Sequence, residues 1–182
     1  TQDVFWVSGA CMMVRSELYH KFGGLDADFF AHMEEIDFCW RMQNQGFRLC
    51  YVPQSKVLHV GGGALPNESP RKLFLNFRNN LLMLYKNLPA NRLIPVLGFR
   101  MLMDGAAAAV YLLTGRFAYF SAVWKAHMDY YHRLPTYRVK RKYFQRYQGR
   151  IRYAGYYPGS ILCAYFVRNV RSASSLKNKM IE

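Results

Sequence analysis

The chain has 182 residues, of which 52% are hydrophobic and 20% are charged. This composition excludes a collagen, a disulfide-rich miniprotein and a disordered polyelectrolyte, and it predicts a folded domain with a sizeable core. The formal net charge of +14 is unevenly spread, because residues 1–90 hold nine Lys/Arg against eight Asp/Glu, whereas residues 91–182 hold sixteen against three. We therefore expect a near-neutral part with clustered carboxylates, followed by a basic and aromatic part.

The first part of the chain predicts short helices and strands in alternation. Apolar runs at the N-terminus and after the second helix are typical of strands, while i,i+4 apolar pairs closed by glycines are typical of helices. The expected elements are a buried strand at residues 4–7, helices at 15–22 and 34–45, and strands at 47–52 and 55–60. This pattern predicts an α/β fold class for the region.

The rest of the chain predicts helices. Ser69 as a cap and Pro70 in the first turn mark the start of the first of them. Arg100 and Asp104 interrupt the most apolar segment, so we expect interfacial helices here and no clean membrane span. The expected helices are 69–87, 93–113, 117–131, 138–152 and 160–170, and the expected domains are 1–66 and 67–182.

The densest acidic cluster begins the second helix. On a helix Glu34, Asp37 and Arg41 share one face, and Asp37 can pair with Arg41. Glu35 points about 100° away from that face and lies beside the helix N-terminus, where the helix dipole favours an ionised carboxylate. That placement suits a general base. The alternative is an ordinary acidic first turn with an i,i+4 salt bridge.

His59 is the second candidate, because it follows an apolar run and precedes Gly61-Gly62-Gly63. A histidine in this position is either a hydrogen-bonded core residue or a metal ligand, and the residues alone leave both open. Neither a P-loop nor a GxGxxG motif accompanies the glycines. Asp26-Ala27-Asp28 has the form of a DxD metal motif, but no predicted strand leads into it.

Taken in order, these segments resemble the second half of glycosyltransferase family 2, of the rhamnosyltransferase-like kind with the GT-A fold. The resemblance is close over about residues 4–65 and looser through Arg78-Asn79-Asn80. The segments that carry it are Ser8-Gly9-Ala10, Arg15, Phe22-Gly23-Gly24-Leu25-Asp26, Phe29-Phe30, the run from Glu34 to Arg41, Gly46-Phe47-Arg48, Tyr51-Val52-Pro53 and Val57-Leu58-His59.

The resemblance implies roles for individual residues. Glu35, which stands where the family usually has Asp, would deprotonate an acceptor hydroxyl that displaces a nucleoside diphosphate with inversion, and Glu34 would orient the acceptor. Gly9 and Ala10 would lie under the donor sugar. The resemblance further implies that Asp37 and Trp40 contact the substrate, and that His59 completes the coordination of Mn²⁺ or Mg²⁺.

The family's strand-borne DxD motif and its nucleotide-binding units have no counterpart in this sequence. We therefore expect part of a hexosyltransferase-type enzyme, truncated in this chain and inactive by itself. Its partners would be a nucleotide-sugar donor and a glycan or polyprenyl-linked acceptor.

The basic part, with aromatic residues interleaved from Arg138 to Arg152, leaves three alternatives: a nucleic-acid surface, a solvated basic surface or a membrane surface. No nucleic-acid-binding motif is present, so we expect no nucleic acid. Lys/Arg beside aromatics and interrupted apolar helices favour anionic lipid headgroups, which predicts a peripheral protein on the cytoplasmic face of the membrane. The four cysteines form no CxxC pair, which favours reduced thiols. The competing function is a non-catalytic membrane-binding module.

Overall fold

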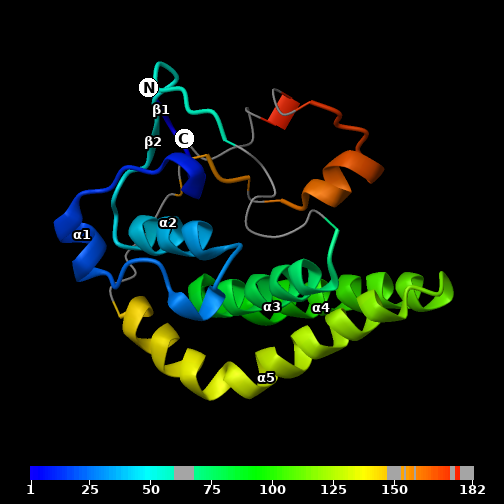
Figure 1. Cartoon of the computed structure of the whole chain (residues 1–182). Helices are drawn as coiled ribbons and strands as arrows, with labels where there is room; N and C mark the ends of the chain where they lie inside the picture. The colour runs from blue at the N-terminus through cyan, green and yellow to red at the C-terminus, as the bar shows by residue number, and fades with distance from the viewer. Residues whose placement is uncertain (60–67, 147–152, 154, 158, 173–174, 177–182) are drawn as a thin grey trace.

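The computed structural model of the protein describes residues 1–59, 68–146, 153, 155–157, 159–172 and 175–176 (Figure 1). Helices dominate this part of the chain. In order, the elements are β1 (Gln2–Asp3), the 3₁₀ turn η1 (Gly9–Cys11), α1 (Ser16–Lys21), the 3₁₀ turn η2 (Ala27–Phe29), α2 (Glu34–Asn44), β2 (Cys50–Tyr51), α3 (Pro70–Asn87), α4 (Ala90–Leu113), α5 (Phe117–Gln145) and the π-helical turn η3 (Cys163–Val167).

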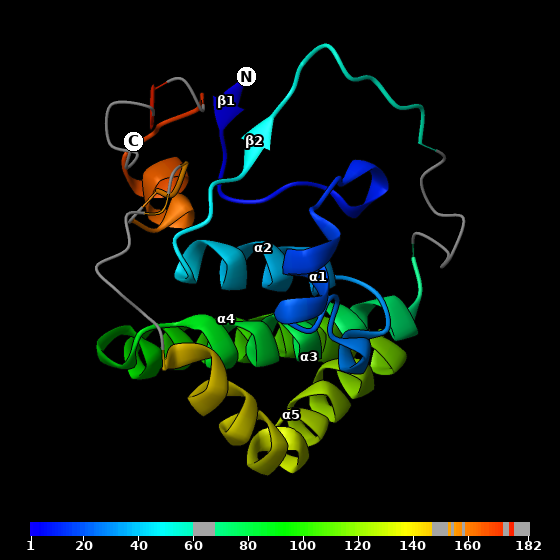
Figure 2. The ribbon, with the colours of Figure 1, turned by 90° about the vertical axis from the view of Figure 1, so that its left-hand side faces the viewer.

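The long helices α3, α4 and α5 pack side by side as one layer (Figures 1 and 2). α3 and α5 share the most extensive contact, and α4 packs against both. α5 contains Pro135 and is visibly bent in Figure 2. Proline removes one helix hydrogen bond and clashes with the preceding turn, which accounts for a bend in a helix of this length.

The N-terminal region lies on this helical layer, with α2 directly against α3. Phe29 and Trp40 from the N-terminal region join Leu81 of α3 and Tyr137 of α5 in one hydrophobic cluster. Phe29 and Tyr137 are fully buried and meet edge to face, with ring centroids 6.4 Å apart. The two parts of the chain therefore share a core. The boundary expected at residue 66 lies outside the described residues.

The expected sheet is much reduced in the described part of the chain. β1 and β2 form an antiparallel pair, with Gln2 opposite Tyr51 and Asp3 opposite Cys50. Residues 4–7 are irregular rather than a buried strand, and Trp6 is 45% exposed. Residues 55–59 are likewise irregular and exposed, and residue 60 lies outside the described residues. A strand needs a neighbouring strand that pairs its N–H and C=O groups. In the first segment the Val4 N–H binds Leu49 O at 3.0 Å, and the Val4 and Phe5 carbonyls accept instead from the Gln43 side chain at 3.0 and 2.9 Å.

The helix predictions are closer to the structure. α1, α2, α3 and α4 match their expected ranges to within three residues at each end. The separate helices expected at 117–131 and 138–152 form one continuous helix, α5, up to Gln145, and residues 147–152 lie outside the described residues. All four cysteines are free.

The membrane prediction needs a correction in one respect. By length and composition alone, α4 is sufficient to cross a membrane, with a mean hydropathy of 1.5 over its most apolar window. From the sequence, no helix was expected to form a clean membrane span, because Arg100 and Asp104 interrupt the most apolar segment. Only 11% of that window is buried, so α4 differs from a core helix of a soluble protein.

Candidate functional site

The acidic start of α2 is held in place by an unusual backbone turn. Phe30, His32 and Met33 have φ values of 64°, 69° and 74°, and Met33 is the N-cap of α2 in the left-handed conformation. Residues other than glycine rarely adopt positive φ, and each such residue costs on the order of 1–3 kcal/mol unless its surroundings hold it. This turn directs Glu34 and Glu35 into the first turn of α2.

α3 supplies the groups that hold the turn. The Asn79 amide nitrogen lies 2.9, 2.8 and 2.9 Å from the carbonyl oxygens of Phe29, Ala31 and His32. Because an amide nitrogen has two hydrogens, one of these bonds is shared. The Arg78 guanidinium donates to the carbonyl oxygens of Asp28 and Phe29 at 2.8 and 3.2 Å. Two consecutive residues of α3 thus fix the turn that precedes α2.

Three polar atoms at this site are buried without a protein partner: His32 Nε2, Glu34 Oε2 and Glu35 Oε2. Buried polar atoms are normally hydrogen-bonded, so three unpaired ones within four residues indicate a place where a ligand or water completes the bonding. Burial, together with the neighbouring Glu35 carboxylate, raises the pKa of Glu34. Glu34 therefore holds a proton to a higher pH than an exposed glutamate does.

The turn η1 lies against this acidic pair. Ser8 caps η1 through its hydroxyl, which accepts from the Ala10 N–H at 3.3 Å. A Cβ atom placed on Gly9 would lie 3.6 Å from the Glu35 Cβ, so η1 and the start of α2 are in van der Waals contact. Gly9 and Ala10 are both exposed. The structure therefore brings the predicted donor-side turn and the predicted base together.

Asp37 and Trp40 lie elsewhere. The Asp37 carboxylate is fully buried and is bound by the Arg41 Nε at 2.9 Å, the Lys86 Nζ at 2.8 Å and the Asn87 amide at 2.7 Å. Trp40 is 6% exposed and packs edge to face on Phe5, with centroids 5.4 Å apart. Both side chains are packed inside the protein and support the site from its interior side. Both are buried here, and their contact with substrate stays a prediction.

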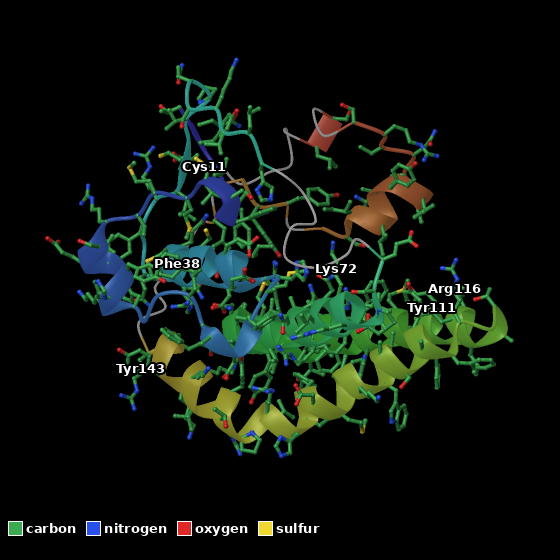
Figure 3. All side chains as sticks on the ribbon, in the orientation of Figure 1. Cys11, Phe38, Lys72, Tyr111, Arg116 and Tyr143 are labelled. Carbon is green, nitrogen blue, oxygen red and sulfur yellow. The ribbon has the colours of Figure 1, made fainter. Side chains whose placement is uncertain are left out.

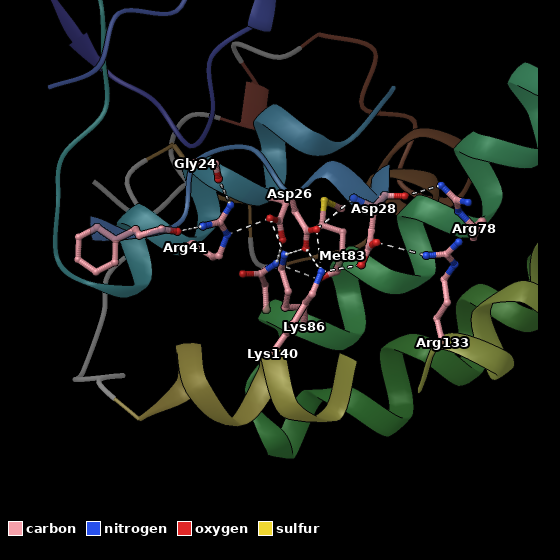
Figure 4. A network of polar contacts seen from close by, with 12 residues as sticks. Gly24, Asp26, Asp28, Arg41, Arg78, Met83, Lys86, Arg133 and Lys140 are labelled. Carbon is pink, nitrogen blue, oxygen red and sulfur yellow. Dashed lines mark hydrogen bonds and ion pairs between the residues drawn. The ribbon is translucent and has the colours of Figure 1, made fainter. Parts of the chain in front are cut away.

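Beneath the site, a network of ion pairs joins the N-terminal region to α3 and α5 (Figure 4). Asp26 accepts from Lys86 at 2.7 Å and from Lys140 at 2.7 Å, and Lys140 also reaches Asp28 at 2.6 Å. Burial alone would raise the pKa of Asp26, but the two lysines outweigh it and lower the pKa to about 2. The Asp-Ala-Asp triplet is therefore part of a structural ion-pair network, and its carboxylates already have cationic partners.

Sequence reasoning missed this network. Asp26 and Lys86 are 60 residues apart, and Asp26 and Lys140 are 114 residues apart. No local spacing relates residues so distant. The available signal was only indirect, namely charged residues inside otherwise apolar helix faces.

The structure describes His59 as an exposed residue of an irregular segment, while the glycines that follow lie outside the described residues. Within the described residues, no group of three His, Cys, Asp or Glu side chains is arranged to hold a metal ion. The described residues alone therefore do not form a cation site, and His59 would contribute a single ligand to one.

A cavity of about 390 Å³ lies beside the positive-φ turn. Phe30, Arg71, Arg78 and Arg133 are among the residues that line it. Two of these arginines are occupied: Arg78 pairs with Asp129 at 3.1 Å, and Arg133 pairs with the same carboxylate at 2.8 Å. Neither Glu34 nor Glu35 lines the cavity.

Comparison with known proteins gives consistent matches to the first part of the chain. Residues 1–81 match the family described as "Glycosyltransferase like family 2". The N-acetylglucosaminyl-diphospho-decaprenol L-rhamnosyltransferase of Mycobacterium tuberculosis is 39% identical over 58 residues, which cover 32% of this chain and 19% of that protein. Rhamnosyltransferase WbbL of Escherichia coli is 38% identical over 56 residues, 31% of this chain and 21% of the relative.

A third relative is the low-salt glycan biosynthesis hexosyltransferase Agl10 of Haloferax volcanii, which is 29% identical over 75 residues, 41% of this chain and 24% of that protein. No solved structure matches the chain. The chain thus covers about a fifth to a quarter of the length of these curated relatives.

Proposed function

Because residues 1–81 belong to glycosyltransferase family 2, of the rhamnosyltransferase-like kind, we propose that this chain is the acceptor-side part of an inverting glycosyltransferase. The reaction would move a sugar from a nucleoside-diphosphate sugar to a hydroxyl of a glycan or lipid-linked acceptor. The observation that carries the proposal is the pair of glutamates at the start of α2, each with a buried oxygen that lacks a protein partner, held by the positive-φ turn.

Glu35 is proposed as the general base. Its carboxylate would take the proton of the acceptor hydroxyl as that oxygen attacks the anomeric carbon, and the nucleoside diphosphate would leave from the opposite face with inversion. The helix N-terminus stabilises the ionised form of Glu35 that this role requires. Gly9 lies against Glu35, which supports a donor sugar above η1 beside the base.

Glu34 is proposed to orient the acceptor. Burial raises the pKa of Glu34, so its carboxyl keeps a proton to a higher pH than an exposed glutamate would. A protonated carboxyl donates one hydrogen bond and accepts another, and this suits a sugar hydroxyl. The two neighbouring carboxyls would thus divide the work, with Glu35 accepting a proton and Glu34 holding the acceptor.

We propose that the enzyme uses a divalent cation, Mn²⁺ or Mg²⁺, and that His59 is the one ligand that the described residues supply to it. A bound cation would supply charge stabilisation to the departing diphosphate. Since the described residues do not form a complete metal site, its other ligands would have to come from outside them. We propose that the donor site is formed by a part of the enzyme outside these 182 residues. We therefore expect that the 182-residue chain alone does not catalyse sugar transfer.

The acceptor and the location are proposals as well. The name of one relative, the rhamnosyltransferase of Mycobacterium tuberculosis, refers to a decaprenol-linked acceptor for that protein. For this chain we propose a glycan or polyprenyl-linked acceptor and a peripheral position on the cytoplasmic membrane face. The +14 charge supports an anionic surface as the partner.

The decisive experiment is Glu35→Gln in the longest natural form of the protein, assayed for sugar transfer. Loss of a general base typically costs about 10²–10⁴-fold in rate, so we expect a loss in that range. Glu17→Gln on exposed α1 is the matched control and should leave transfer unchanged. His59→Ala in the same background tests the cation ligand, with the loss expected to depend on the cation concentration.

A second candidate function is a non-catalytic membrane-binding module that retains the half-fold as a scaffold. The largely exposed helix α4 is the observation that favours it. Full transfer activity in Glu35→Gln would reject Glu35 as the base, whereas membrane binding by a parent protein that transfers no sugar would favour this second function.

A further inference from the structure

From Leu93 to Leu113 the outward face of α4 is apolar, while Asn91 and Arg92 at the start of the helix are exposed. Between Leu93 and Leu113 every exposed residue is apolar, a glycine or a proline. The large side chains on this face are strongly exposed: Ile94 81%, Phe99 50%, Leu102 69%, Val110 58%, Leu112 45% and Leu113 86%. At 1.5 Å per residue, this face is about 30 Å long.

The two charged residues between Leu93 and Leu113 face the other way. Arg100 and Asp104 form an ion pair at 2.7 Å, and the Asp104 side chain is 3% exposed. His127 of α5 meets Asp104 at 3.2 Å, and the Arg100 guanidinium lies 5.1 Å from the centre of the Phe77 ring of α3. Polar groups therefore point to neighbouring helices and apolar groups point outward. That distribution is the reverse of a water-facing helix and is typical of a helix that contacts lipid.

The packing of α4 decides between spanning and lying flat. α4 has 24 residues, enough to cross a bilayer. However, it packs beside α3 and α5, and those helices carry Arg78, Lys86 and Asp129. If α4 crossed the bilayer, these charged helices would enter the hydrocarbon with it, at a cost of several kcal/mol for each charge. An orientation parallel to the membrane exposes only the outward half of α4 to lipid.

The hairpin geometry agrees with this orientation. α4 and α5 meet at a projecting end where Tyr111 and Arg116 lie (Figure 3). Tyr111 and Tyr119 pack with ring centroids 5.5 Å apart. A hairpin that entered end first would have to carry Arg116 through the hydrocarbon to the far side, whereas a flat hairpin leaves its guanidinium at the headgroups.

We propose that the outward face of α4 is a membrane-contacting surface that lies in the plane of one leaflet, with its apolar side chains in the boundary between headgroups and acyl chains. The occupant is anionic lipid rather than a second copy, because residues 91–182, which include α4, hold sixteen Lys/Arg against three Asp/Glu, so an anionic surface attracts this part of the chain and two copies of it repel each other. The inference rests on the proposed membrane location but not on sugar transfer.

Flotation of the 182-residue chain with vesicles of phosphatidylcholine and phosphatidylglycerol (7:3) tests the surface. The double variant Leu102→Glu/Leu113→Glu should bind at least tenfold more weakly than the parent. The control Met13→Glu/Leu58→Glu adds the same charge at two fully exposed residues of the N-terminal region and should lose much less. Circular dichroism of both variants checks that the helices remain. Equal losses in the two variants, or parent-like binding of the α4 variant, would overturn the proposal.

Depth measurements test the flat orientation. A polarity-sensitive fluorophore is attached through Ile94→Cys, Leu102→Cys or Leu113→Cys, one at a time, with the other accessible cysteines replaced by serine. Quenching by lipids brominated at different acyl positions should report the same shallow depth at all three sites. A label at 102 that lies much deeper than the labels at 94 and 113 would indicate spanning, and it or a steady change of depth along the helix would reject the in-plane orientation.

Light scattering without lipid tests whether a second copy of the chain, rather than lipid, covers this surface. A dimer that Leu102→Glu/Leu113→Glu dissociates, in a chain that binds no vesicles, would show a second copy as the occupant and overturn the lipid assignment. Because these assays contain no sugar donor, their failure is distinguishable from failure of the proposed transferase. Glu35→Gln should float like the parent.

Discussion

Asn79 stabilises the turn that leads into the site, although no sequence motif near the glutamates indicates this role. Its side-chain amide binds three carbonyl oxygens of the turn before α2, and Asn79 itself is fully buried. Asn79→Ala would remove the side-chain donor of the Ala31 and His32 carbonyls, whereas the Phe29 carbonyl would keep the Arg78 guanidinium. An orphaned buried polar group costs about 1–3 kcal/mol, so we expect the free energy of unfolding to fall by about 2–4 kcal/mol in denaturant titrations.

Asn80→Ala is the matched control, since Asn80 is adjacent, partly exposed and makes none of these bonds. We expect a change below about 0.5 kcal/mol for it. Equal destabilisation by the two substitutions would mean that the amide of Asn79 does not hold the turn.

Asp26 predicts a pH dependence of stability. Its pKa is about 2 in the folded protein against an ordinary value of 3.8, and its side chain is 12% exposed. A depressed pKa stabilises the fold above pH 3.8, and the contribution is lost as the pH falls through about 2. The shift corresponds to about 2 kcal/mol. Stability measured from pH 6 to pH 2 should therefore fall less steeply in Asp26→Asn than in the parent, with exposed Glu17→Gln as the unchanged control.

At the scale of elements, the start of α3 illustrates how local sequence determines a boundary. The Ser69 hydroxyl accepts from the Lys72 N–H at 3.1 Å, and Pro70 occupies the first turn. We expect Ser69→Ala to lower stability by about 1 kcal/mol because one N–H of the helix start loses its acceptor. Ser69→Asp should retain most of the stability.

Ser16→Ala provides the comparison for this test. Ser16 is the first residue of α1, and α1 has no side-chain cap. Removal of the Ser16 hydroxyl should therefore change stability little in the same thermal or denaturant assay. A Ser16→Ala effect as large as that of Ser69→Ala would show that capping is not the cause.

The interior elements also show where local reasoning stops. The glycine and serine signals around α2 and α3 predicted those helices closely, because caps and helix ends depend on neighbours within one turn. The strands expected at 4–7 and 55–60 were wrong over the described residues, because a strand depends on a partner that local sequence does not specify. The turn at residues 30–33 was also missed, since its positive φ values are maintained by α3 rather than by glycines.

For the whole molecule, charge asymmetry predicts a salt-sensitive membrane interaction. Arg138 and Lys142 are exposed on α5. Each basic residue near an anionic surface contributes about 1 kcal/mol, so Arg138→Gln/Lys142→Gln should weaken binding to phosphatidylglycerol-containing vesicles by roughly 30-fold at low salt. The measurement is vesicle co-sedimentation, and the difference should disappear at about 0.5 M NaCl.

Arg15→Gln/Lys56→Gln is the matched control, because it removes the same charge from exposed residues of the near-neutral first part. A loss of binding equal to that of the α5 variant would mean that total charge, rather than its location on α5, sets the affinity.

The sequence by itself determined the similarity of residues 1–81 to glycosyltransferase family 2, the α2, α3 and α4 helices and the acidic pair at the start of α2, because these features depend on residues close together in the chain. Only the tertiary structure decided that Asp37 and Trp40 are buried supports, that Asp26 is neutralised by lysines 60 and 114 residues away, and that α4 directs its charges inward. Such pairings depend on which helix faces meet. A one-dimensional pattern gives the face of a helix but not the neighbour that covers it.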